Sequence, residues 1–198
     1  MVYVLSKELK LRIISAVILG GIVLEITWFG GQAFIILWAV AAVLILIETT
    51  RISGKSIRNG PKVLSFICLI VLLGLWLSGY YKASLSLYVA GLIVVTSWEL
   101  FLRKSAWAAF GLLYAGLPFF TITQIRGEGT DSLVAVVVLF ACVWGADIFA
   151  YIAGRSIGGP KLAPKISPNK TWSGFVGSLV GAIICSLAFI LGMGFKPE

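Results

Sequence analysis

Apolar stretches of helical length recur along the whole chain and leave little polar sequence between them. Hydrophobic residues make up 60% of the 198 residues and charged residues only 12%, whereas a soluble domain of this size needs far more polar surface. The sequence therefore predicts an all-α, polytopic membrane protein with about seven transmembrane helices in one domain over residues 1–198. The expected spans are Leu11–Phe29, Ala33–Ile47, Val63–Gly79, Leu85–Ser97, Ala106–Gln124, Leu133–Ala153 and Gly174–Phe195. The second and fourth are short for a full crossing, so we expect them to extend into their flanks, tilt or be partly re-entrant.

Basic residues fall mainly on one side of the expected helices. With the N-terminus in the cytoplasm, 13 of the 16 Lys and Arg residues lie in cytoplasmic segments, and only Lys82, Arg126 and Lys196 lie opposite. The positive-inside rule predicts this bias. It also explains the net charge of +8 by contact with anionic membrane lipids, without a nucleic-acid partner. The longest basic loop, residues 154–173, is expected in the cytoplasm.

The stretch 143–178 combines a membrane-embedded acid with a basic loop. Asp147 lies well inside an expected span, where a carboxylate costs about 2.5–3.5 kcal/mol on insertion and usually faces a bundle interior or a wet cavity. The loop after it has no acid and carries Arg155, Lys161, Lys165 and Lys170. This pattern indicates a place where phosphates and a metal ion meet the membrane. The alternatives are a structural acid paired with a neighbouring cation and an ordinary basic loop that only sets topology.

Glycines and prolines in residues 154–173 are expected to prevent a regular helix there. Ser167 and Thr171 add hydroxyl groups that can bond phosphate or a metal-bound water. The segment 167–171 resembles a turn into the last helix, with Ser167 or Asn169 as the cap and Pro168 at a turn or first-turn position. Free N–H groups at that helix start would favour an anion.

The absence of histidine, the cysteines and the remaining acidic residues limit the reactions that the chain could catalyse. The chain has no histidine, which excludes histidine acid–base, metal or phosphohistidine chemistry within it. Its three cysteines are scattered through apolar spans and are expected to be inert. Glu99 precedes Arg103 by four residues, which predicts an ion pair on a helix surface.

The motifs around the basic loop are specific in order and spacing. Residues 161–175 read KLAPK-x-SP-x-KTW-x-GF, preceded by DIFAY at 147–151 and GR at 154–155, and residues 9–16 read LKLRIISA. Together they resemble the phosphatidate cytidylyltransferases, also called CDP-diacylglycerol synthases. The resemblance runs from the first helix to the last and is strong only in 143–178.

The resemblance implies transfer of a cytidylyl group from CTP to phosphatidic acid, with release of pyrophosphate and a requirement for Mg²⁺. It implies a catalytic role for Asp147, Lys165 and Lys170, with Asp147 also holding the metal. The substrate-binding residues that it implies are Arg155, Lys161, Ser167 and Thr171. It further implies a multi-pass protein of the bacterial inner membrane and a homodimer.

Two departures from the family pattern bear on activity. The family often has Glu after KTW, where this chain has Ser173. The family's signature, a Lys/Asp-rich stretch with a glycine-rich segment and paired aspartates, lies downstream, and the chain ends at Glu198 without it. The sequence therefore looks like the amino-terminal two-thirds of the enzyme, either truncated or a naturally short, inactive relative. An inactive subunit that binds anionic lipid and a transporter or channel fragment remain the alternatives.

Overall fold

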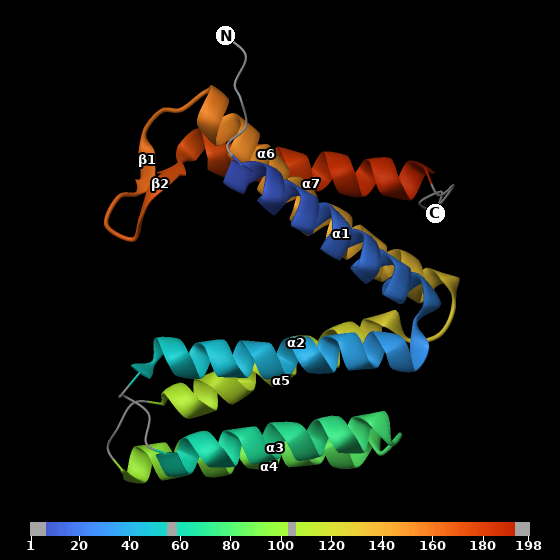
Figure 1. The fold of residues 1–198 in the computed structure, drawn as a ribbon, viewed down its shortest axis with the longest axis vertical. Helices are drawn as coiled ribbons and strands as arrows, with labels where there is room; N and C mark the ends of the chain where they lie inside the picture. The colour runs from blue at the N-terminus through green and yellow to red at the C-terminus, as the bar shows by residue number, and fades with distance from the viewer. Residues whose placement is uncertain (1–6, 55–58, 103–105, 193–198) are drawn as a thin grey trace. The chain divides into compact units, whose positions relative to one another are not determined.

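The computed structural model describes residues 7–54, 59–102 and 106–192. Its helices and strands follow one another along the chain as labelled in Figure 1. They are α1 (Lys7–Phe29), α2 (Gly31–Ile52), α3 (Asn59–Leu77), α4 (Tyr81–Phe101), α5 (Trp107–Arg126), α6 (Thr130–Ser156), β1 (Lys161–Ala163), β2 (Ser167–Thr171) and α7 (Trp172–Gly192). The chain divides into two compact units, residues 1–128 (unit 1) and residues 129–198 (unit 2).

The helices confirm the predicted all-α membrane fold. Six of them, α2 to α7, are long and apolar enough to cross a membrane, whereas the apolar part of α1, Ile14–Phe29, is shorter. The two stretches expected to be short belong to α2 and α4, which have 22 and 21 residues. Both therefore extend into their flanks. The expected end of the last span at Phe195 lies outside the described residues.

Aromatic side chains fill the core of unit 1. Trp76 from α3 meets Tyr81, Phe119 and Phe120 edge to face, with ring centroids 4.8, 5.8 and 5.0 Å apart. Such pairs contribute about 0.5–1.5 kcal/mol each beyond the burial of their area. The cluster joins the end of α3 and the start of α4 to the second half of α5.

Polar side chains in unit 1 reach main-chain carbonyls of neighbouring helices. Ser84 on α4 donates from Oγ to the carbonyl of Leu72 on α3 at 2.7 Å. Tyr88, also on α4, donates from its hydroxyl to the carbonyl of Leu113 on α5 at 2.9 Å. Since the hydrocarbon region of a bilayer offers no water, hydroxyl groups there must find partners within the protein.

Glu99 holds the start of α5. Its side chain is 2% exposed, and its two oxygens accept hydrogen bonds from the main-chain N–H groups of Ala108 and Ala109, both at 3.0 Å. These residues stand second and third in α5, where N–H groups have no partner within the helix. The prediction that Glu99 lies on a helix surface is therefore wrong, and Arg103, its expected partner, lies outside the described residues. The spacing rule considers one helix, whereas the carboxylate serves the next.

The Glu99→Gln variant tests this helix cap. The amide keeps one acceptor oxygen but turns an NH₂ group toward a main-chain N–H, so one buried donor loses its partner. We expect the free energy of unfolding to fall by about 1–3 kcal/mol, measured by SDS titration of the detergent-purified protein. The control is Glu48→Gln on exposed Glu48 of α2, which should change little. Equal unfolding curves for the two variants would contradict the cap.

Candidate functional site

In unit 2, α6 and α7 pack backbone to backbone. A Cβ atom on Gly181 of α7 would lie 2.5 Å from the carbonyl oxygen of Gly145 on α6. A Cβ on Gly177 would lie 2.8 Å from the carbonyl oxygen of Phe149. Real Cβ atoms essentially never come so close to backbone, so only glycine fits at these two positions. Small residues at helix interfaces are how membrane helices approach closely.

The other face of α6 carries Asp147, Tyr151 and Arg155, which follow one another at intervals of four residues and are all exposed in this structure. Arg155 donates from Nη1 to the Tyr151 hydroxyl at 2.9 Å, and its guanidinium carbon lies 5.9 Å from the centre of the tyrosine ring. Asp147 and Arg155 are about 12 Å apart along the helix axis. The predicted acid and the first predicted cation therefore share one open face, with Tyr151 between them.

The basic loop folds into a small β-hairpin. Strands β1 and β2 pair antiparallel, with Lys161 opposite Thr171 and Ala163 opposite Ser167. Residues 157–171 are not helical, as predicted, but the expected irregular segment was too long at both ends, because α6 continues to Ser156 and α7 begins at Trp172. The two strands were not expected from the glycines and prolines of the loop. Pro168 lies within β2, not at a turn or at the first turn of α7.

Thr171 joins the hairpin to α7. Its side chain is buried, and its Oγ1 accepts a hydrogen bond from the main-chain N–H of Gly174 at 3.2 Å. Gly174 is the third residue of α7, so Thr171 occupies the N-cap position. The prediction of a cap at Ser167 or Asn169 is therefore wrong, because the strand runs on to Thr171 before the helix begins. The binding role expected of the Thr171 hydroxyl stays a prediction.

Two further contacts hold the hairpin against the start of α7. The hydroxyl of Ser173 donates to the carbonyl of Gly158, and the main-chain N–H of Trp172 donates to the carbonyl of Pro160 at 3.1 Å. Gly158 and Gly159 have φ angles of +66° and +102°, the left-handed region that favours glycine. Hydrogen bonds from the first two residues of α7 therefore hold the segment that links α6 to the hairpin.

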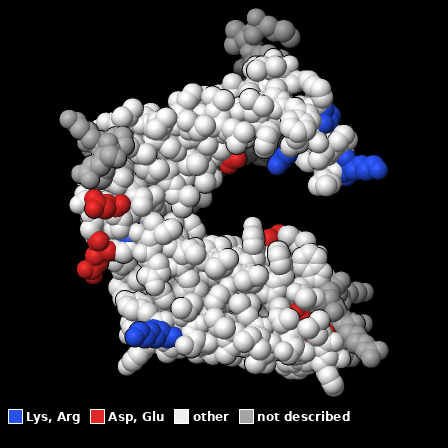
Figure 2. Space-filling view, turned by 180° about the vertical axis from the view of Figure 1, so that it is seen from behind, with Lys and Arg blue, Asp and Glu red and all other residues white. Residues whose placement is uncertain are grey.

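The cations of the loop all lie on the surface of unit 2. Arg155 lies in the last turn of α6, Lys161 and Lys170 lie on the strands, and Lys165 lies in the turn between the strands. All four are exposed. Ser167 is half-buried at the start of β2. Figure 2 shows Lys and Arg side chains gathered at the end of unit 2 that carries the hairpin. The predicted phosphate-binding residues thus come from one short supersecondary element.

A complete metal site made only of protein side chains is not present in the part of the chain that the structure describes. No group of three or more His, Cys, Asp or Glu residues there could hold a metal ion. Mg²⁺ is commonly held by one or two carboxylates together with waters and substrate phosphates. Asp147 fits that arrangement as one ligand, with phosphate oxygens as others.

A comparison with protein families agrees with these motifs, since the cytidylyltransferase family matches residues 10–197. The chain belongs to the cytidylyltransferase family. The similarity that the motifs indicated is thereby confirmed for nearly the whole chain, including α6, the hairpin and α7. No solved structure matches the chain significantly.

Individual relatives are phosphatidate cytidylyltransferases. The protein of that name from Brucella abortus (strain 9-941) is 37% identical over 179 residues, which cover 89% of this chain and 65% of the relative. Another, from Staphylococcus haemolyticus (strain JCSC1435), is 28% identical over 196 residues, covering 95% of this chain and 74% of the relative. The chain therefore spans just under two-thirds of the length of its Brucella relative.

The packing of α6 on α7 is tested by Gly181→Ala. We expect amide hydrogen exchange in α6 and α7 to be faster, because the new methyl group must push the helices apart. The free energy of unfolding should fall by about 1–3 kcal/mol. The control is Gly192→Ala in the same helix, where a Cβ would have nothing within 4 Å. The gain in helix propensity at Gly181, inside the helix, would by itself slow the exchange, so faster exchange reports the clash. Equal exchange in both would argue against the close approach.

Proposed function

We propose that this chain acts in phospholipid biosynthesis as a phosphatidate cytidylyltransferase, transferring CMP from CTP to phosphatidic acid to give CDP-diacylglycerol and pyrophosphate. The observation that carries the proposal is the hairpin with its three exposed lysines, next to exposed Arg155 in the last turn of α6. The hairpin is set between two membrane-length helices in a chain of the cytidylyltransferase family. A lipid substrate can reach such a site without its acyl chains leaving the bilayer.

The reaction brings several negative charges together. A phosphate oxygen of phosphatidic acid attacks the α-phosphorus of CTP, the new P–O bond forms, and pyrophosphate leaves with the electrons of the old one. Such a step needs no covalent nucleophile of the protein; positioning and charge neutralisation supply most of the catalysis. Lys165 and Lys170 bind the phosphates, and Arg155 and Lys161 assist them.

Asp147 is the proposed protein ligand of Mg²⁺, which would neutralise charge on the phosphates when bound. Its place on an open face of α6 leaves the carboxylate accessible to a metal–nucleotide complex within unit 2. Tyr151 and Arg155 on the same face extend the site toward the hairpin.

The hydroxyl groups have two different tasks in this proposal. Ser167, half-buried at the start of β2, orients a phosphate oxygen. Thr171 acts by position, because its Oγ1 already accepts the N–H of Gly174 and sets β2 against α7. This hydrogen bond fixes the position of Lys170, the preceding residue of β2, relative to α7.

The proposed location is the bacterial inner membrane, with the hairpin facing the cytoplasm, where CTP is found. The placement of basic residues supports this orientation. No nucleic-acid partner is proposed, because the positive charge is accounted for at the membrane surface. A homodimer stays a prediction that rests on the family resemblance alone.

Removing single hairpin cations tests the phosphate site. We expect Lys165→Gln and Lys170→Gln each to weaken binding of radiolabelled CTP at least about tenfold, because each removes a charge-assisted hydrogen bond to phosphate. The matched control is Lys82→Gln, which removes an exposed lysine at the start of α4, in unit 1. The site assignment fails if the three variants bind CTP alike. Solute flux by the wild type without CTP turnover would favour a transporter.

The role of Asp147 is tested by its dependence on Mg²⁺. With CTP and phosphatidic acid as substrates, we expect Asp147→Asn to raise the Mg²⁺ concentration for half-maximal formation of CDP-diacylglycerol at least about tenfold, since a neutral amide is a poor ligand for this ion. The control, Asp131→Asn, removes the exposed acid in the first turn of the same helix. An unchanged Mg²⁺ dependence in Asp147→Asn would exclude the carboxylate as a ligand.

A further inference from the structure

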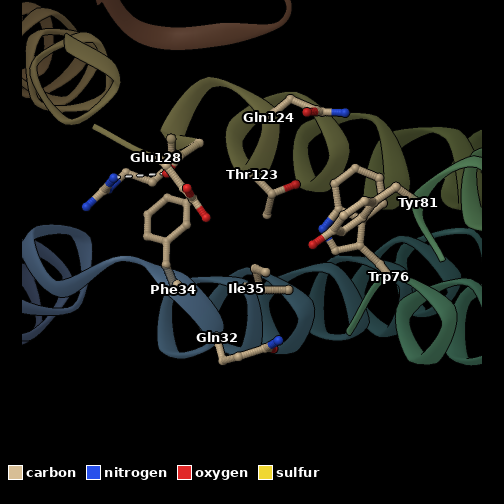
Figure 3. Close-up of a pocket in the computed structure, with 11 residues that line it drawn as sticks. Gln32, Phe34, Ile35, Trp76, Tyr81, Thr123, Gln124 and Glu128 are labelled. Atoms are coloured by element: carbon tan, nitrogen blue, oxygen red, sulfur yellow. Dashed lines mark hydrogen bonds between the residues drawn. The ribbon is translucent and has the colours of Figure 1, made fainter. Parts of the chain in front are cut away.

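A pocket of about 350 Å³ opens at one end of unit 1, and none of the residues proposed for catalysis lines it. It lies where α2 begins, α3 ends, α4 begins and α5 ends. Figure 3 shows the rings of Trp76 and Tyr81 at one end of the pocket, and Phe34 and Glu128 at the other. Pockets of roughly 300–1,000 Å³ are the size that holds small ligands, and this one is at the lower limit.

The pocket is lined by a buried cation, Arg126, whose side chain is only 8% exposed. Its guanidinium donates from Nε to the carbonyl of Thr27 at 2.7 Å, from Nη2 to Trp28 at 3.0 Å and from Nη1 to Gly127 at 3.2 Å. All three partners are main-chain carbonyls, and no carboxylate among the described residues pairs with it. A guanidinium has five N–H groups, so two remain free to donate.

The guanidinium is held in one orientation. Thr27 and Trp28 lie in the last turn of α1, where carbonyls lack helical partners and a cation is favoured. Gly30, with φ +65°, also lies against the guanidinium, since a Cβ there would be 2.5 Å from Nη2. These carbonyls offset part of the charge, but a buried cation without a counter-ion remains costly. The geometry therefore favours an anion from outside the chain.

An acid and aromatic rings line the same pocket. Glu128 is exposed, and its carboxylate makes no hydrogen bond to any described residue in this structure. Trp76 and Tyr81 meet edge to face at 4.8 Å. Carboxylates and aromatic faces both attract ammonium groups. The pocket thus presents one cationic and one anionic group, which suits a ligand that carries both charges.

We propose that this pocket binds the headgroup of a zwitterionic phospholipid. The phosphodiester accepts hydrogen bonds from Arg126, and the ammonium group lies toward Glu128 and the rings of Trp76 and Tyr81. Four membrane-length helices begin or end at this pocket, which places it at the depth of lipid headgroups. Tryptophan and tyrosine are enriched at that interface. The acyl chains then run along apolar residues of unit 1 that the structure leaves exposed, among them Ile36 and Val40.

Native mass spectrometry of the detergent-purified full chain tests the proposal. The probes are phosphatidylethanolamine, phosphatidylglycerol, which has the phosphodiester without the ammonium, and soluble glycerophosphoethanolamine, which has both charges without acyl chains. We expect one phosphatidylethanolamine adduct, several-fold less phosphatidylglycerol, and no displacement of the lipid by an equal concentration of the soluble headgroup. Equal binding of the two lipids, or displacement by the soluble compound, would overturn the proposal.

Three variants locate the adduct. We expect Arg126→Gln to reduce phosphatidylethanolamine binding about tenfold or more, by loss of charge-assisted hydrogen bonds. Lys82→Gln, which removes an exposed cation in the first turn of α4 that does not line the pocket, should bind as the wild type does.

The third variant, Glu128→Gln, separates binding from folding. Arg126 also holds the end of α1, whereas Glu128 makes no hydrogen bond whose loss would unfold the protein. We expect Glu128→Gln to bind the two lipids equally, because the group that prefers the ammonium is gone. If Glu128→Gln kept the wild-type preference for phosphatidylethanolamine, the proposal would be wrong. This outcome does not depend on transferase activity, so it is independent of the function proposed for unit 2.

Discussion

The main-chain groups that a helix leaves open at its ends need partners, and this constraint explains the most informative polar contacts of the protein. Glu99 covers the first N–H groups of α5, Arg126 covers the last carbonyls of α1, and Thr171 caps α7. In each case a side chain from another segment supplies what the helix end lacks. The connections between helices can therefore be short and still leave few unsatisfied main-chain groups.

The sequence predicted the number and type of helices well because membrane helices are set by length and apolar content. It predicted their ends less well. The second expected span stopped at Ile47, whereas α2 continues to Ile52 through polar residues. Thr49 and Thr50 explain the difference, since their hydroxyls donate to the carbonyls of Ile45 and Ile47 in the same helix. Polar residues that bond to their own helix do not end it.

The candidate site, like the helices, was predicted only in part. The order and spacing of its residues formed a motif that could be recognised in the sequence. The structure places Asp147 and the loop cations in one unit. The hairpin was not predicted, because glycines and prolines indicate irregular backbone and say little about pairing between two short segments. Glu99 was misjudged and the contacts of Arg126 were not predicted, for a different reason. Glu99 bonds main-chain N–H groups 9 and 10 residues away, and Arg126 bonds two carbonyls 98 and 99 residues away, which no local spacing rule considers. A charged residue next to a predicted helix end is the signal that could have suggested both.

The length of α6 has a consequence for how the protein is made. Among the described residues it is the longest helix, with 27 residues, and its most apolar 18-residue stretch has the highest mean hydropathy of such stretches in the six membrane-length helices. A translocon sums contributions along a segment, so an apolar surplus can outweigh one unfavourable residue. The helix can thus enter the membrane with Asp147 already in place, before its partners arrive. The apolar residues of α6 itself then offset the cost of placing the Asp147 carboxylate in the membrane. The later packing of α6 against α7 need not supply that free energy.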